Sequence, residues 1–476
     1  MKSSRFKPLA GFMLAATMAG ALIAAPALAQ TASGAPASSA AATASAAATA
    51  APAAATPAPA ATPAPVKIDS GDTAWMLTSS VLVLMMTIPG LALFYGGMVR
   101  KKNILATLAQ SFGATALITV LWMIVGYSIA FTDGGSHNAY LGGFKYIMLK
   151  PMGLNATSTL APTIPESVYM FFQMTFAIIT PALIAGALAD RMKYSAFLLF
   201  MGAWLLLVYC PIAHWVWGNG WLGAKGALDF AGGTVVHLNA GTAGLVAALM
   251  LGKRKGLGTE NFAPHNLAYS VIGASLLWVG WFGFNAGSAV TSNVGAGMAA
   301  AATQIATAAA TLAWMGMEWI ISKKPSVLGM VSGAVAGLVA ITPASGYVDA
   351  SGALYIGIAA GVVCYFSAVH VKKMIGYDDA LDCWGVHGVG GALGAILTGV
   401  FAQKAINPSI TGGWLADHNF AQMGLQFLDV GAVFGYCLVV TFVILLVLKY
   451  TIGIRVSEEV EEEGLDINLH GEVVHG

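Results

Sequence analysis

Eleven apolar runs, each about as long as a membrane is thick, restrict the fold of this chain more than any other feature. A membrane helix needs about 20 mostly apolar residues, and such runs lie at 73–99, 104–131, 165–189, 195–216, 232–251, 266–290, 296–322, 326–343, 351–371, 381–402 and 424–449. Only 9% of the 476 residues are charged, against about 25% in soluble domains. Lipid must therefore cover part of the surface. The sequence predicts an all-α integral membrane protein with eleven transmembrane helices.

The residues before the first run predict segments outside this fold. A basic start, an apolar run and the small-residue sequence Ala27-Leu28-Ala29 predict a signal peptide at 1–29. An uncleaved first membrane helix is the alternative. Residues 30–68 are nearly all Ala, Pro, Thr and Ser, and predict a disordered extracytoplasmic linker. A membrane domain at 69–452 and a cytoplasmic tail at 453–476 complete the predicted organisation.

Positive charge is unevenly divided between alternate connections. Fourteen Lys and Arg residues occupy the connections of one side and four occupy those of the other. Because basic residues are retained in the cytoplasm, we predict an extracytoplasmic N-terminus and a cytoplasmic C-terminus. The net charge of +1 suggests no nucleic-acid partner.

One pattern, D-x7-H-x3-G-x2-G, occurs at 229–244 and again at 379–394. The copies fall on the fifth and tenth runs, so helices 1–5 and 6–10 would form an inverted repeat, whose interface holds the pathway in transporters. Eight helical residues cover about 12 Å, so His237 and His387 would meet near the middle of a layer about 30 Å thick. Histidines within membrane runs are candidates for function, and simple helix packing is the alternative for both.

Seven stretches closely resemble the ammonium transporter family (Amt/Mep/Rh), and bacterial Amt proteins most of all. They are FYGGMVRKKN (94–103), FFQMTFAIIT (171–180), PIAHWVWGNG (211–220), DFAGGTVVHLNAG (229–241), GWFGFNAGSA (280–289), DDALDCWGVHGVGG (378–391) and GIRVSEEVEEEGLDINLHGE (453–472). The likeness begins near Asp72 and reaches the C-terminus. It implies a homotrimer with one pore per subunit, located in the inner (plasma) membrane.

The resemblance also implies an outer ammonium site. Trp217, Phe172 and Phe176 would shape it, Ser288 would accept a hydrogen bond from the ion, and Asp229 would support it from beneath. Taken alone, Trp217 fits an interfacial tryptophan. Asp229 fits a helix cap equally well, since two glycines lie just inside the helix start.

Below this site, the resemblance implies that Phe176 and Phe284 close the pore and that His237 and His387 line it. These residue types suit ammonium. Aromatic faces attract cations by about 0.5–2 kcal/mol, whereas phenyl rings offer nothing to a charge deeper in the membrane. We therefore expect ammonium to lose a proton near Ser288 and Phe176, so that neutral ammonia crosses, with or without net proton transfer. Potassium has no proton to lose.

The remaining features concern partners and competing functions. Five glutamates between Ser457 and Gly464 indicate a solvated acidic face, whereas the resemblance implies a regulatory tail that helps receive a cytoplasmic PII-type signal protein. An ammonium sensor and a neutral gas channel for ammonia or carbon dioxide are the alternative functions. No known catalytic motif occurs in a suitable structural setting, so we expect no enzymatic activity, no cofactor and no metal site. All four cysteines, Cys210, Cys364, Cys383 and Cys437, are expected to be buried apolar residues without disulfides.

Overall fold

The computed structural model describes residues 67–474, and every regular element among them is helical. The long apolar helices are α2 (Ser70–Met85) with η1 (Met86–Leu91) and α3 (Ala92–Met98), α4 (Ile104–Leu121) with η3 (Trp122–Gly126) and α5 (Tyr127–Phe131), α6 (Glu166–Leu188), α7 (Tyr194–Trp204) with η6 (Leu205–Tyr209) and α8 (Cys210–Trp217), η7 (Gly233–Leu238) with α10 (Asn239–Leu251), α11 (Leu267–Asn285), α12 (Val294–Ser322), α13 (Val327–Ile341), α14 (Ala350–Tyr365) with η9 (Phe366–Val371) and α15 (Lys372–Ile375), η10 (Cys383–Gly388) with α16 (Val389–Phe401), and α18 (Phe420–Thr451). Short helices complete the set: η2 (Lys101–Asn103), η4 (Gly135–His137), η5 (Ile147–Leu149), α9 (Trp221–Ala224), η8 (Gly287–Ala289), α17 (Trp414–Asp417), α19 (Glu458–Glu463) and η11 (Asp466–His470).

The all-α prediction is confirmed, and each of the eleven predicted runs coincides with one long helical segment. Ten of these segments in the described residues are long and apolar enough to cross a membrane. The eighth run forms α13, which has only 15 residues. The predicted signal peptide, and the predicted linker up to residue 66, lie outside the described residues.

Local chemistry explains where several of these helices begin. The side chains of Asn293, Ser326 and Asp349 each accept a hydrogen bond from the backbone N–H three residues later, at the starts of α12, α13 and α14. Such caps satisfy backbone donors that a helix leaves free at its first turn. These capping residues therefore mark the positions at which α12, α13 and α14 begin.

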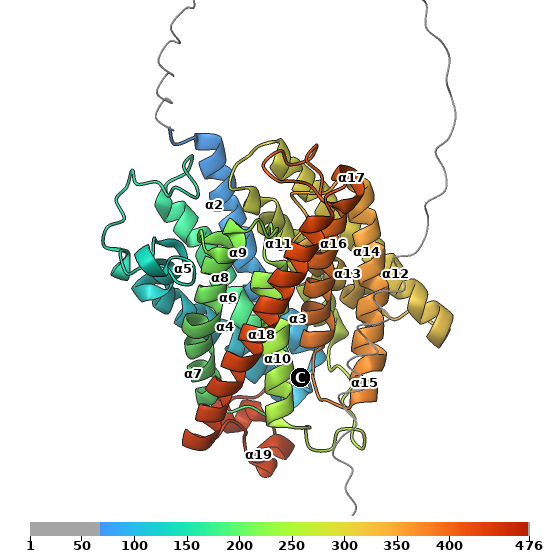
Figure 1. The fold of residues 1–476 in the computed structure, drawn as a ribbon. Helices are drawn as coiled ribbons and strands as arrows, with labels where there is room; N and C mark the ends of the chain where they lie inside the picture. The colour runs from blue at the N-terminus through green and yellow to red at the C-terminus, as the bar shows by residue number, and fades with distance from the viewer. Residues whose placement is uncertain (1–66, 475–476) are drawn as a thin grey trace, which may run out of the picture. The chain divides into compact units, whose positions relative to one another are not determined.

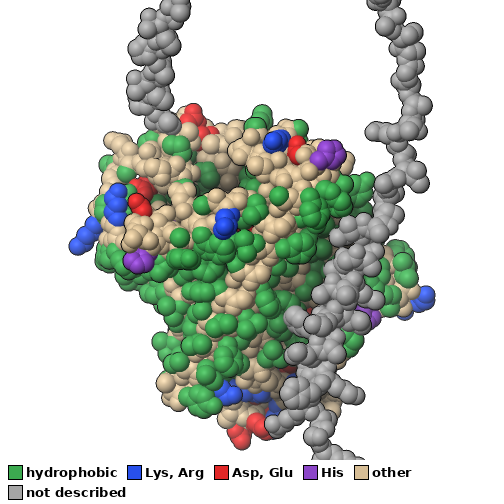
Figure 2. Space-filling view, in the orientation of Figure 1, with side chains coloured by type: hydrophobic (Ala, Val, Ile, Leu, Met, Phe, Trp, Pro, Cys, Tyr) green, Lys and Arg blue, Asp and Glu red, His purple; other side chains and the backbone are tan. Residues whose placement is uncertain are grey.

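The helices of residues 67–474 pack side by side, and the surface between their two ends is largely hydrophobic (Figures 1 and 2). On α18 the side chains of Val439, Val443 and Val447 are each at least half exposed. Soluble proteins rarely expose contiguous apolar surface on this scale. Helix α2 begins at the end of the bundle opposite α19 (Figure 1), so the described chain starts and finishes at different ends.

Candidate functional site

Aromatic rings from three helices form the first part of a continuous column. The ring of Phe176 on α6 lies 4.9 Å from that of Phe172, one turn earlier. It meets Trp217, at the end of α8, edge to face at 5.8 Å. On its other side it stacks on Phe284 of α11 at 4.1 Å. Three of the rings are fully buried and Trp217 is half-buried. The structure thus brings all four predicted rings together.

Ser288 lies close to this cluster, on η8. A Cβ atom added at the neighbouring Gly287 would lie 3.0 Å from the ring of Phe172. The Ser288 hydroxyl donates a hydrogen bond of 2.8 Å to the carbonyl oxygen of Phe284. Its own oxygen therefore keeps lone pairs with which to accept a hydrogen bond from another donor. The oxygen is thus free for the acceptor role that the resemblance implies for Ser288, and that role stays a prediction.

The two predicted histidines continue the column beyond Phe284. The ring of His237 lies 5.9 Å from that of Phe284 and 5.4 Å from that of His387. The two Nδ1 atoms are 3.3 Å apart, so one nitrogen must carry a proton and the other a lone pair. Both side chains are at least 96% buried, with relative exposures of 1% and 4%. The histidines therefore form a coupled pair that can share a proton.

Trp281 also contacts this pair, although neither the repeated pattern nor the resemblance assigned it a role. Its indole stacks on His237 at 5.3 Å and donates a hydrogen bond of 2.9 Å to the Thr342 hydroxyl. Trp281 precedes Phe284 by three residues on α11, a spacing that places both on one helix face. That spacing was the sequence signal that could have placed Trp281 beside the column. It is weak, because tryptophans are frequent in apolar runs and an uncharged indole is not unusual there.

Asp229 organises the start of η7. Its Oδ1 accepts hydrogen bonds from the N–H groups of Gly232 (2.8 Å) and Gly233 (2.6 Å). Its Oδ2 accepts from the N–H groups of Thr234 (2.9 Å) and Val235 (3.1 Å). The Asp229 carbonyl oxygen accepts a hydrogen bond of 2.9 Å from the Trp217 indole. Asp229 therefore caps the start of the helix and holds Trp217 at the same time, while its support of an ammonium site stays a prediction.

Both copies of the repeated pattern begin with a wide helical turn, which the prediction of eight regular helical residues missed. The His237 N–H bonds to the Gly232 carbonyl oxygen, five residues back, and the helix starts four residues after Asp229. In the second copy, Asp379 Oδ2 accepts from the Trp384 N–H at 2.7 Å, and the helix starts at Cys383. Such π-turns are common at functional sites. They change the direction in which each histidine points.

The motif glycines are needed where the two copies cross. A Cβ atom added at Gly241 would lie 2.2 Å from the Gly388 nitrogen. One added at Gly391 would lie 2.5 Å from the Gly233 carbonyl oxygen and 3.0 Å from the His237 Cβ. Each copy therefore uses its own glycine to approach the other's backbone. This close contact is the reason the pattern pairs a histidine with a glycine four residues later.

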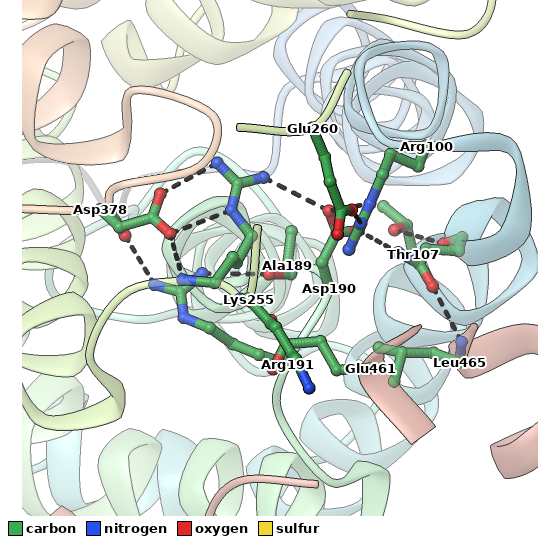
Figure 3. A network of polar contacts seen from close by, with 12 residues as sticks. Arg100, Thr107, Ala189, Asp190, Arg191, Lys255, Glu260, Asp378, Glu461 and Leu465 are labelled. Carbon is green, nitrogen blue, oxygen red and sulfur yellow. Dashed lines mark hydrogen bonds and ion pairs between the residues drawn. The ribbon is translucent and has the colours of Figure 1, made fainter. Parts of the chain in front are cut away.

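A polar network connects the loops at the α19 end of the bundle (Figure 3). Arg254 holds Asp378 through two side-chain bonds of 2.9 and 3.0 Å and reaches Asp190 at 3.3 Å. Arg100 also contacts Asp190 at 3.3 Å. Burial would raise the pKa of Asp378, but the bonds and charge of Arg254 outweigh it and hold that pKa below its usual value. These contacts therefore connect four loops at this end of the bundle, two that carry an arginine and two that carry an aspartate.

The acidic tail packs onto the same loops. Glu461 accepts a hydrogen bond of 2.7 Å from Arg455, and Lys255 pairs with Glu458 at 2.8 Å. Asp466 accepts from two N–H groups at the start of α4, those of Leu105 (3.0 Å) and Ala106 (2.8 Å). The expectation of a solvated acidic face therefore holds for four of the five glutamates, which are exposed, whereas Glu461 is buried. Asp466, which follows that stretch, is buried as well.

Residues outside the column have structural places. His214, which lies in one of the resembling stretches, contacts the carbonyl oxygens of Ala130 at 2.9 Å and Asn138 at 2.7 Å. It therefore holds a loop and takes no part in the column. The cysteine prediction is confirmed for the described residues, since all four thiols are buried and free.

A bundle of membrane-length helices around a buried aromatic and histidine column defines a multi-pass membrane protein of the transporter or channel class. The Ammonium Transporter Family model matches residues 74–475. An ammonium transporter of Aquifex aeolicus (strain VF5) is 51% identical over 408 residues, covering 85% of this chain and 93% of that one. The Candida albicans Mep2 structure is 38% identical, with a TM-score of 0.77 over 82% of this chain and 87% of that one. A structure described as a sensor Amt protein is 28% identical, with a TM-score of 0.76 over 84% of this chain and 98% of that one. The chain belongs to the ammonium transporter family.

Proposed function

We propose that this protein moves ammonium across the membrane by binding the ion at the outer aromatic site, removing one proton and conducting ammonia past the histidine pair. The observation that carries the proposal is the unbroken column from Trp217 through Phe176 and Phe284 to His237 and His387. The partly exposed ring of Trp217 lies at one end of this column, and the buried ring nitrogens of the two histidines lie at the other.

The outer site has the contacts that a small cation needs. The faces of Trp217 and Phe172 attract a cation by about 0.5–2 kcal/mol each, and the Ser288 oxygen is available to accept one N–H. The negative charge of Asp229 lies behind Trp217, to which it is joined through its carbonyl group. Below this site the stacked rings of Phe176 and Phe284 leave no polar atom to replace the hydration of an ion.

Ammonium therefore loses its proton before the stacked rings, since neutral ammonia can pass them at a much lower free-energy cost. The His237–His387 pair then offers ring nitrogens as hydrogen-bond partners for ammonia. Because the two Nδ1 atoms share a hydrogen bond, the pair is also suited to return the displaced proton. Potassium, which has no proton to release, is rejected.

The wider setting of the pore belongs to the same proposal. Spans 1–5 and 6–10 form an inverted repeat, with the α19 end in the cytoplasm and residue 67 outside the inner (plasma) membrane. Three copies form the homotrimer, and the docked acidic tail helps receive a PII-type signal protein. The basic loops gathered at the α19 end support this orientation, because positive charge is retained in the cytoplasm.

A second candidate function is ammonium sensing, favoured by the likeness to the sensor Amt protein. Binding at the outer site would then bias the conformation of the α19 end without a transported product. Neutral gas conduction is a third candidate, but the Trp217, Phe172 and Ser288 cluster favours a site for the charged ion.

The test is an ammonium pulse applied to reconstituted protein on a solid-supported membrane. We expect a current from the parent, its loss in His237→Ala with His387→Ala, and its retention in the control His137→Ala, which changes an exposed loop histidine. A rapid internal pH rise without current would instead indicate electroneutral ammonia conduction. Neither signal, from well-folded protein in which ammonium still binds, would refute transport in favour of sensing.

A further inference from the structure

The last long helix, α18, buries a polar stripe against the segment that leads to the outer site. Gln422, Gln426 and Asp429 follow one another at intervals of four and three residues and are at most 1% exposed. Gln426 accepts a hydrogen bond of 2.8 Å from the Leu228 N–H and returns one of 2.8 Å to the Leu228 carbonyl oxygen. The stripe therefore holds the backbone immediately before Asp229.

Asp429 is the ionisable member of this stripe, and it lies inside a membrane-length helix. Its side chain is fully buried, and its Oδ2 lies 2.9 Å from the Thr234 hydroxyl oxygen. Its Oδ1 has no hydrogen-bond partner among the described residues. An ionised carboxylate at such depth needs a counter-charge or several donors. Asp429 has one hydroxyl neighbour and a second carboxyl group beyond it.

Thr234 lies between Asp229 and Asp429, and its single hydroxyl hydrogen determines how these three side chains can be protonated. Its hydroxyl oxygen lies 2.8 Å from Asp229 Oδ2 and 2.9 Å from Asp429 Oδ2. A hydroxyl has one hydrogen and can donate to only one of the two oxygens. At the other carboxyl group, the short contact is a hydrogen bond only if that carboxyl group is protonated and donates to the Thr234 oxygen. One of the two acids therefore carries a proton.

The surrounding contacts decide which acid that is. The oxygens of Asp229 accept four backbone N–H bonds, and such bonds favour the ionised form. Asp429 accepts none of these, and burial favours its neutral form. The hydrogen bonds then run in one direction, from the Asp429 O–H to Thr234 and from the Thr234 O–H to Asp229.

We propose that Asp429 is a neutral, proton-carrying acid at neutral pH and a positioning residue for the outer site. It acts through Thr234 on Asp229, whose carbonyl oxygen in turn holds Trp217. The pair of acids thus places one negative charge behind the cation site instead of two. The functional part of this inference rests on the proposed ammonium transport, whereas the protonation state does not.

Infrared spectroscopy of the full-length protein in lipid tests the protonation state directly. A protonated carboxyl group has a carbonyl stretch distinct from that of a carboxylate, and it shifts in heavy water. We expect the parent spectrum at neutral pH to contain a component that disappears in Asp429→Asn and Asp429→Leu but persists in Thr234→Val. If neither Asp429 variant lost such a component, the conclusion that Asp429 carries a proton would be wrong.

Ammonium currents from the same variants test the positioning role. Asn keeps an N–H that can donate to Thr234, so Asp429→Asn should match the parent in half-saturating ammonium concentration. Asp429→Leu and Thr234→Val break the hydrogen-bond chain and should raise that concentration severalfold. If Asp429→Asn weakened binding as much as Asp429→Leu, the residue would act through a charge and the inference would be wrong.

The two readouts separate failure of this inference from failure of the proposed function. A parent without ammonium current would refute transport, while the infrared comparison would still decide whether Asp429 carries a proton. If Asp429→Leu does not fold, Asp429→Asn and Thr234→Val together still carry the test. Parent-like currents in Thr234→Val would then refute positioning.

Discussion

Replacing Gly241 by alanine should separate the histidine pair without touching either ring. Gly241 lies on α10, where an added Cβ would stand 2.2 Å from the nitrogen and 2.3 Å from the Cα of Gly388. Ordinary contact begins at 3.4 Å, so the two backbones must move apart by more than an ångström. The obstacle is main chain, which cannot rotate away as a flexible side chain can.

The size of the effect follows from that displacement. Forcing extra atoms into a packed core costs about 1–3 kcal/mol, and occasionally more, and we expect the upper part of that range because backbone must shift. Gly388 directly follows His387, so the same movement lengthens the Nδ1–Nδ1 contact from 3.3 Å to beyond hydrogen-bonding distance. A misplacement of about 1 Å can lower a rate on the order of 100-fold.

Thermal unfolding and ammonium currents of the purified variant measure both effects. Gly316→Ala on α12 is the matched control, because nothing lies within 4 Å of its added Cβ. Alanine in an open helical position should be neutral or stabilising by up to about 1 kcal/mol. If Gly241→Ala were as stable and as active as Gly316→Ala, the close crossing of the two repeats would not control the histidine geometry.

Three further outcomes follow from other contacts. Trp217→Leu should raise the half-saturating ammonium concentration severalfold, since a cation–π contact of about 0.5–2 kcal/mol is lost; unchanged dose–response curves would contradict this. Asp378 has a lowered pKa, so its pairing with Arg254 stabilises the fold above pH 3.8 and is lost as the pH falls through the folded value. Asp378→Asn should therefore lower the unfolding temperature at neutral pH, with a deficit that shrinks in acid; a constant deficit would exclude the ionic explanation. Asp466→Ala removes the acceptor for two N–H groups of α4, at a cost of about 0.5–2 kcal/mol, and should speed proteolysis of the tail while the bundle stays intact.

Much of the site was predictable because its residues carry unusual chemistry for a membrane helix. His237 and His387 stand out as ionisable groups in apolar runs, and the repeat links them across 150 residues. Phenylalanines do not stand out in this way, so Phe176 and Phe284 were selected only through the family resemblance. Asp429 was overlooked even though it lies in an apolar run, because it belongs to no repeated pattern and to no resembling stretch.

The sequence alone determined where the long apolar helices lie, and ten of the eleven predicted runs are membrane-length in the described residues. The cost of exposing backbone and charge to lipid is what makes long apolar runs readable. It also determined that two histidines occupy equivalent places in two copies of one residue pattern. Only the tertiary structure decided the 3.3 Å contact between their rings, the wide turns that direct them, and the single hydroxyl that joins Asp229 to Asp429. Those features depend on how closely two helices approach. That distance is set by glycine-to-backbone contacts between segments far apart in the chain, which a linear pattern does not encode.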